Sequence, residues 1–279
     1  MRRLLRPFCL ASLMLIALPV LVMVSCQHKL IYVPRSYPQT HDAQWIHHTG
    51  GKVLSCHTSE GRQQAYLFRP RPQLAPRRLW LVCGGNATLA TEWTSFMKNE
   101  APPEDAYLLI DYPGYGHNEG KASPEKIRES LRQLVPLAAA ELAWDEAQMR
   151  SSTRIFGHSL GCAVALLAAE EFSLRRGVLI APFTSTMDMS REWIGLDVGF
   201  LVLHRFDNRK ALQRISTDPQ ARIHLLHGSK DGVIPAEMSC QLHRIAPPRF
   251  PLTLCENCGH NDWQMRHSRE MVDAMKSVE

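Results

Sequence analysis

From residue 79 onward, short apolar runs alternate with longer amphipathic stretches in this 279-residue chain. No other feature of the sequence restricts the possible folds as strongly. The runs have the length of buried strands: LWLVC, AYLLID, RIFG, GVLIAP, IHLLHG and PLTLCE. The stretches with helical periodicity are SPEKIRESLRQLVPLAAAEL, GCAVALLAAEEFSLRR, PAEMSCQLHRIA and REMVDAMKSV. Apolar strands that alternate with helices indicate a mostly parallel sheet covered on both faces. We therefore predict an α/β fold whose functional residues lie beyond the carboxyl ends of the strands.

The segment before residue 79 has a different pattern. Residues 44–69 contain short alternating stretches, QWIHH, KVLSCH and QQAYLFR, separated by turn residues. These predict an antiparallel opening of the sheet. Residues 26–43, which include LIYVPRSYPQ, are predicted to form an extended tether before a domain that spans 44–279.

The N-terminus has the features of an export signal. MRRLLRP is basic, and the 18 residues FCLASLMLIALPVLVMVS that follow carry no charge. This pattern predicts a signal peptide over residues 1–25, since the apolar run is barely long enough to span a bilayer. The stretch Met23-Val24-Ser25-Cys26 resembles a bacterial lipobox, which implies that Cys26 is lipidated. An uncleaved signal anchor and a plain signal peptide are the alternatives.

The predicted location follows from this leader. Gln27 stands where the lipoprotein retention signal has Asp, so the resemblance implies a membrane-anchored protein on the periplasmic face of a bacterial outer membrane. Three of the arginines behind the net charge of +5 lie in the leader, and no Lys/Arg-rich run follows. Nucleic acid is therefore not an expected partner.

The pentad Gly157-His158-Ser159-Leu160-Gly161 fits the pattern G-x-S-x-G between a predicted strand and a predicted helix. This strand–turn–helix context is the one in which a nucleophilic serine is raised above the sheet. At the start of a helix, free N–H groups and the dipole favour developing negative charge. A turn with a capping serine is the structural alternative.

A nucleophilic serine needs a base, and the base needs an orienting acid. Asp231 follows the strand IHLLHG, and His260 follows the last strand, PLTLCE. Both come after Ser159, in the order acid then histidine that accompanies this motif. We predict a catalytic triad of Ser159, Asp231 and His260, with the backbone N–H groups of Asn86 and Leu160 as oxyanion donors.

At this point the chain resembles the α/β-hydrolase superfamily, and within it BEM46-like proteins and α/β-hydrolase-domain depalmitoylases. The matching stretches are LIYVP, CGGNA, DYPGYGHNEG, GHSLG, APFTS, HGSKDGVIP and GHND. The resemblance implies hydrolysis of esters or thioesters without a cofactor, but it does not imply which ester. Anchoring near a membrane favours a lipid ester or an acylated protein as the substrate. An amidase or peptidase of the same serine class is the alternative activity. Gly84 and Asn118 depart from the usual motif residues, His and Ser, which implies different substrate contacts near the oxyanion site.

Two further regions carry expectations. Residues 184–219 fall where such folds carry a lid, and we expect a short lid that packs on the domain and partly lines the pocket. Cys255, Cys258 and His260 offer a rival interpretation as a metal or thiol site, with Cys240 or Asp262 as a fourth ligand. A disulfide that involves Cys240, Cys255 or Cys258 and braces the loop of His260 is the expected alternative use of these cysteines, whereas Cys83 and Cys162 are predicted to be buried thiols.

Overall fold

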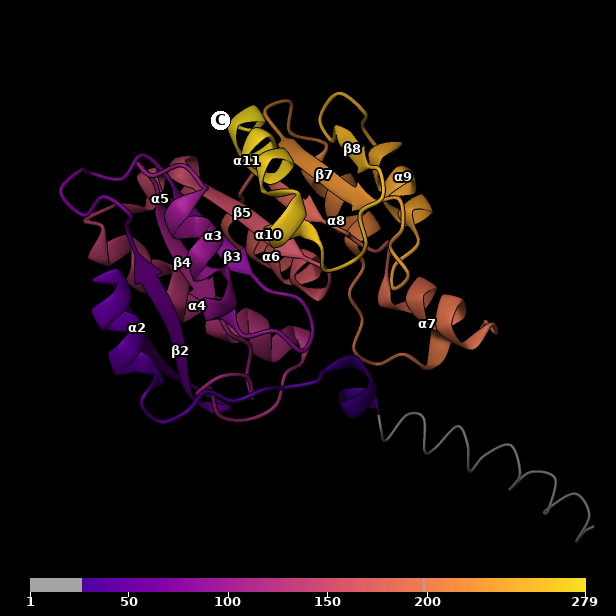
Figure 1. Cartoon of the computed structure of the whole chain (residues 1–279). Helices are drawn as coiled ribbons and strands as arrows, with labels where there is room; N and C mark the ends of the chain where they lie inside the picture. The colour runs from indigo at the N-terminus through magenta and orange to yellow at the C-terminus, as the bar shows by residue number, and fades with distance from the viewer. Residues whose placement is uncertain (1–26, 198) are drawn as a thin grey trace, which may run out of the picture.

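The computed structural model describes residues 27–197 and 199–279 (Figure 1). The predicted signal peptide, residues 1–25, and the predicted lipidation site, Cys26, lie outside these residues. Within the described ranges, no helix combines the length and the apolar character needed to cross a bilayer.

One sheet of eight strands runs through the molecule in the order β1-β2-β4-β3-β5-β6-β7-β8. The strands β1 and β2 pair antiparallel, β2 pairs antiparallel with β4, and every later pairing is parallel. The strand bounds are β1 Lys52–Thr58, β2 Gly61–Phe68, β3 Leu79–Cys83, β4 Ala106–Ile110, β5 Thr153–His158, β6 Arg176–Ile180, β7 Arg222–Gly228 and β8 Leu252–Cys255. The predicted mostly parallel sheet is thus confirmed, and each of the six apolar runs forms a strand.

Helices cover both faces of the sheet, so that two apolar clusters form on its opposite sides. One cluster lies under α4, α6, α8 and α9, and the other lies under α2, α3, α10 and α11. Successive residues of a strand alternate between the clusters, as Leu81 and Val82 of β3 do, because side chains alternate across a sheet. The helix bounds are α2 His41–Thr49, η1 Ala90–Trp93, α3 Thr94–Asn99, α4 Pro124–Glu141, α5 Glu146–Ser152, α6 Leu160–Phe172, α7 Thr186–Ile194, η2 Gly199–Leu201, α8 Asn208–Ile215, α9 Ala236–His243, α10 Trp263–Arg266 and α11 Ser268–Ser277.

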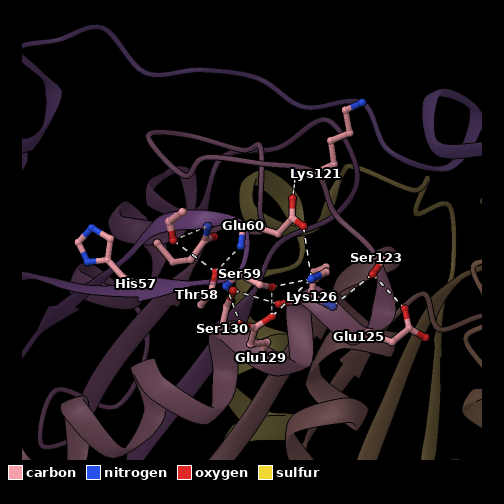
Figure 2. Close-up of polar contacts among 12 residues, drawn as sticks. His57, Thr58, Ser59, Glu60, Lys121, Ser123, Glu125, Lys126, Glu129 and Ser130 are labelled. Atoms are coloured by element: carbon pink, nitrogen blue, oxygen red, sulfur yellow. Dashed lines mark hydrogen bonds and ion pairs between the residues drawn. The ribbon is translucent and has the colours of Figure 1, made fainter.

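The turn between β1 and β2 is held to α4 by a polar cluster (Figure 2). The amide of Ser59 donates to Glu129 at 2.7 Å, and Lys126 of the same helix approaches Glu60 at 3.5 Å. Ser123 caps α4 by accepting a hydrogen bond from the amide of Lys126. These contacts fix the antiparallel end of the sheet to the layer that also contains α6, the helix that begins beside Ser159.

One stretch before β1 was expected to be a strand, and this expectation is wrong. QWIHH was expected as a strand but lies in α2, where Trp45 packs edge-on against Tyr66 and Phe68 of β2. Gly50 ends this helix in the left-handed conformation, at φ 66°. Five alternating residues fit a short helix as well as a strand, and burial of the indole decides between them.

The predicted tether is not extended away from the domain. Residues 27–43 pack on it, and both Tyr32 and Tyr37 are buried. The amide of Val33 donates to the side chain of Asn86, and the carbonyl of Arg35 accepts from the amide of Gly116. The folded unit therefore includes residue 27 onward rather than starting at residue 44.

Candidate active site

Ser159 sits on a strained turn between β5 and α6. Its backbone has φ 56° and ψ −120°, a conformation that a serine adopts only when the surrounding structure imposes it. The turn is tight because β5 runs directly into the helix, which begins at Leu160. A Cβ on Gly161 would lie 2.0 Å from the carbonyl oxygen of Cys83, and one on Gly157 would lie 2.6 Å from that of Gly161. Both glycines are therefore required by close backbone approach.

This contact gives a stability prediction. Replacing Gly161 with alanine should lower the free energy of unfolding by about 3 kcal/mol or more, because the clash is with backbone that cannot rotate away. Chemical denaturation measures the effect. Gly232→Ala is the matched control, since a Cβ there meets no atom within 4 Å. Equal unfolding midpoints for Gly161→Ala and the wild type would contradict the described packing of this turn.

Asp231 and His260 are brought together from the ends of neighbouring strands β7 and β8. Asp231 Oδ2 and His260 Nδ1 lie 2.7 Å apart, and the aspartate side chain is fully buried. Asp231 Oδ1 accepts hydrogen bonds from the amides of Val233 and Ile234 at 2.8 and 2.9 Å. Burial acts to raise the pKa of Asp231, but these hydrogen bonds and the neighbouring histidines hold it well below its usual range. An ionised Asp231 fixes the proton of neutral His260 on Nδ1 and leaves Nε2 as the acceptor.

Ser159 and His260 line the same cavity, which has a volume of about 390 Å³. Among the hydrogen bonds of the described residues, none joins Ser159 Oγ to His260; such bonds are often long in a free enzyme and tighten with substrate. The rest of the wall is mainly apolar and includes Leu30, Ile31, Phe183, Met189, Trp193, Ile194, Leu201, Val202, Val233 and Ile234. Its volume and lining suit an apolar small-molecule group.

The two predicted oxyanion donors line this cavity with Ser159. Leu160 is the first residue of α6, so its N–H has no partner within the helix. The loop of Asn86 is fixed through its side chain, which accepts from the hydroxyl of Tyr115 at 2.7 Å and donates to the carbonyl of Ile31 at 2.9 Å. Within the described part of the chain, neither backbone N–H donates to a protein group. Both are thus free to donate to a negatively charged oxygen near Ser159.

Two buried histidines that sequence reasoning did not select support the site. His158 Nε2 donates to the carbonyl of His260 at 2.9 Å, and burial lowers the pKa of His158 to about 4, which keeps it neutral. His227 lies 3.3 Å from Asp231 Oδ2, and its other nitrogen lies 2.5 Å from the hydroxyl of Ser239. His158 occupies a variable position of the pentad, and His227, the next-to-last residue of β7, precedes the acid in the sequence, so the expected order of the triad selected neither.

The predicted lid, residues 184–219, divides into two parts. Helix α7 and η2 contribute Met189, Trp193 and Leu201 to the cavity wall, whereas Leu212 of α8 is buried in the cluster that contains α6. In Figure 1, α7 stands apart from the sheet. The segment therefore both lines the pocket and packs on the domain.

The two motif departures, Gly84 and Asn118, take part in hydrogen bonds within the fold. Neither Gly84 nor Asn118 lines the cavity. Asn118 Oδ1 accepts from the amide of Gln64 and its Nδ2 donates to the carbonyl of Asp111, which links β2 to the end of β4. The carbonyl of Gly84 accepts from the hydroxyl of Tyr112.

The rival site at Cys255, Cys258 and His260 is not assembled. His260 Nδ1 pairs with Asp231, and the group of possible ligands found in the described residues is Cys255, His267 and Glu270. Burial raises the pKa of Cys255 to about 11 and that of Cys258 to about 12, which favours thiols over metal-binding thiolates.

The described cysteines are all free thiols, so the predicted disulfide involving Cys240, Cys255 or Cys258 is wrong. Cys83 and Cys162 are completely buried, as predicted. The loop that carries His260 is instead held by hydrogen bonds, including the one from the amide of Gly259 to Asp262 at 2.8 Å.

The sequence is similar to those of known proteins. A family model described as "Alpha/beta hydrolase family" matches residues 81–217. The uncharacterized protein Rv2307c of Mycobacterium tuberculosis is 26% identical over 272 residues, which cover 95% of this chain and 92% of that protein. The thioesterase PikA5 of Streptomyces venezuelae is 32% identical over 111 residues, which cover 40% of this chain and 36% of that protein.

Solved structures share the fold at low sequence identity. The esterase Pf2001 of Pyrococcus furiosus superposes with a TM-score of 0.65 and 12% identity, over 89% of this chain and 98% of that one. An alpha-beta hydrolase of Vibrio vulnificus gives a TM-score of 0.67 and 16% identity, over 87% and 88% of the two chains. With the eight-stranded sheet and the family match, these similarities show that the chain belongs to the α/β-hydrolase superfamily.

Proposed function

We propose that the protein is a serine hydrolase that cleaves carboxylic ester or thioester bonds through an acyl-enzyme intermediate on Ser159. The observation that carries this proposal is the position of Ser159, on a strained turn at the start of α6, in one cavity with a His260 that is hydrogen-bonded to buried Asp231. Two backbone N–H groups beside the serine would stabilise the oxyanion.

The steps follow from the groups present. His260 Nε2 takes the proton of Ser159 Oγ as the oxygen attacks the acyl carbon, and the N–H groups of Asn86 and Leu160 bind the oxyanion. The imidazolium then protonates the leaving alcohol or thiol, and water, activated by the same histidine, releases the acid. Asp231 stabilises the imidazolium and fixes the ring.

The cavity wall favours an apolar acyl group. Phe183, Met189 and Ile234 are among the apolar residues of the cavity wall. Each methylene added to the acyl chain is therefore buried against apolar surface until the cavity is full. A lipid ester or an acylated protein therefore fits better than a charged small acid. The closer resemblance to BEM46-like proteins and depalmitoylases stays a prediction, as does anchoring to a bacterial envelope membrane through Cys26 or through an uncleaved leader.

A series of p-nitrophenyl esters tests the substrate class. We expect kcat/KM to rise with acyl length from acetate and then to level off once the cavity of about 390 Å³ is filled. Replacing Met189 with glutamate, which places a charge on the apolar wall, should lower kcat/KM for the longer esters more than for acetate. A preference for acetate in the wild type, unaltered by the variant, would contradict an acyl-binding role for this cavity.

The rate should depend on pH through one group. His260 must be neutral to accept the proton, so kcat/KM should fall at acid pH, where the protonated imidazole can no longer act as a base. The lowered pKa of Asp231 keeps its carboxylate ionised, so it adds no second loss above about pH 4. The same shift stabilises the fold above about pH 4, and that contribution is lost as the pH falls further. A rate that does not fall at acid pH while the protein is still folded would point to a different base.

A further inference from the structure

Several large apolar side chains are exposed around the mouth of the active-site cavity. We define this apolar rim as Leu30, Trp193, Leu196, Phe200, Leu203 and Val233. Phe200 and Trp193 are 70% and 63% exposed, although both are large aromatic groups that gain from burial. Scattered exposed apolar residues are ordinary, but a group gathered at one opening marks a surface that contacts something apolar.

Each residue of the rim lines the cavity or lies within two residues of one that does, as Leu196 does with Ile194. Leu30, Trp193 and Val233 themselves line the cavity, and the indole N–H of Trp193 donates to the carbonyl of Val233 at 3.4 Å. Phe200 and Leu203 flank the pair Leu201–Val202, which also lines the cavity. The rim therefore lies on the surface of the domain beside the active-site cavity.

The N-terminal leader joins the folded domain at the same place. Gln27, the first described residue, is buried, donates to the carbonyl of Leu201 and accepts from the amide of Leu203 at 2.6 Å. In Figure 1 the short helix of residues 27–31 lies on the same side of the molecule as α7. The 26 residues that precede Gln27 contain an 18-residue apolar run that ends at Ser25, so only Cys26 separates this run from Gln27 in the sequence.

We propose that the apolar rim docks on the surface of a phospholipid bilayer, so that the active-site cavity opens directly into the membrane. The two observations are independent, since one concerns exposed side chains of the folded domain and the other concerns where the leader attaches. A leader held in or on a bilayer brings Gln27 to its surface, and the hydrogen bonds of Gln27 bring η2 there too. Acyl chains then enter the cavity from the lipid phase without crossing water.

Trp193 is a reporter for this docking. The chain has six tryptophans, and the five other than Trp193 are at most 9% exposed. The experiment uses the full-length chain with Ser159→Ala, which prevents hydrolysis of lipid, reconstituted in phosphatidylcholine vesicles with or without brominated acyl chains. Brominated lipid should quench the fluorescence of this protein, and the quenching should be lost when Trp193→Phe is added.

A second pair of variants separates the rim from the leader. Leu196→Ser/Phe200→Ser/Leu203→Ser weakens the rim without changing a residue of the cavity wall, and it should reduce the quenching of Trp193. Leu74→Ser/Leu137→Ser removes exposed apolar side chains outside the rim and should leave the quenching of Trp193 unchanged. Both proteins should still float with the vesicles if the leader anchors them.

Three results would overturn the docking proposal: no quenching of the vesicle-bound protein, equal quenching with and without Trp193, or a chain that does not associate with vesicles at all. None of these readouts depends on catalysis, so the proposed hydrolase activity can fail while docking holds, and the reverse. If both hold, the rim variant should lose activity on a vesicle-embedded ester and keep it on a soluble p-nitrophenyl ester.

Discussion

Replacing Ser159 with alanine should reduce kcat/KM for a soluble ester by roughly 10⁴-fold or more, because the variant has no oxygen to form the acyl-enzyme. The fold should survive the change. Among the hydrogen bonds of the described residues none involves Ser159 Oγ, and alanine occupies positive φ elsewhere in this chain, at Ala87 and Ala181. Circular dichroism and the melting temperature check that the variant is folded.

His260→Ala should cause a loss of comparable size, and the double variant should lose little more than either single one. Nucleophile and base act as a unit, so their effects on the barrier do not add. Ser190→Ala is the matched control, since this serine also lines the cavity but donates to the carbonyl of Met187. A Ser159→Ala variant with near wild-type turnover, or fully additive losses, would show that another group performs the chemistry.

Asp231→Asn should lower kcat/KM by roughly 10⁴-fold, although it changes one atom. Asp231 Oδ1 accepts from two backbone amides, so an asparagine keeps its oxygen there and turns its NH₂ group toward His260 Nδ1. That donor selects the tautomer with the proton on Nε2, which can no longer accept the proton of Ser159.

The NH₂ group of the Asp231→Asn variant would take the place of Asp231 Oδ2, which lies 3.3 Å from Nε2 of His227. The expected result is a folded protein with a lowered melting temperature and a large loss in kcat, measured by steady-state kinetics beside thermal unfolding. Asp262→Asn is a useful comparison. Asp262 accepts a hydrogen bond from the amide of Gly259 in the same loop, and this bond does not involve the imidazole of His260. Activity of Asp231→Asn within tenfold of the wild type would remove Asp231 from the proposed triad.

The parts of the fold that could be predicted are those in which local sequence and burial agree. LWLVC and AYLLID are apolar at every position, so only a strand buried on both faces suits them. The proximity of Asp231 and His260 followed from the same pattern, because carboxyl ends of parallel strands meet at one edge.

The parts that were missed depend on contacts between distant residues. Residues 27–43 contain few signals of regular structure, and their packing depends on partners such as Asn86, more than fifty residues away. The supporting role of His158 depends on a carbonyl more than a hundred residues later in the sequence. Such contacts leave no periodicity to read, since side-chain to backbone hydrogen bonds are set by the tertiary fold.

Covalent labelling by a fluorophosphonate, followed by intact mass and peptide sequencing, tests the central claim most directly. The probe reacts with a serine that is activated by a base and placed beside oxyanion donors. The proposal predicts one adduct per chain, on Ser159, absent from Ser159→Ala and strongly slowed in His260→Ala. An unlabelled wild-type protein that still hydrolyses esters, or an adduct on another residue that abolishes activity, would contradict it.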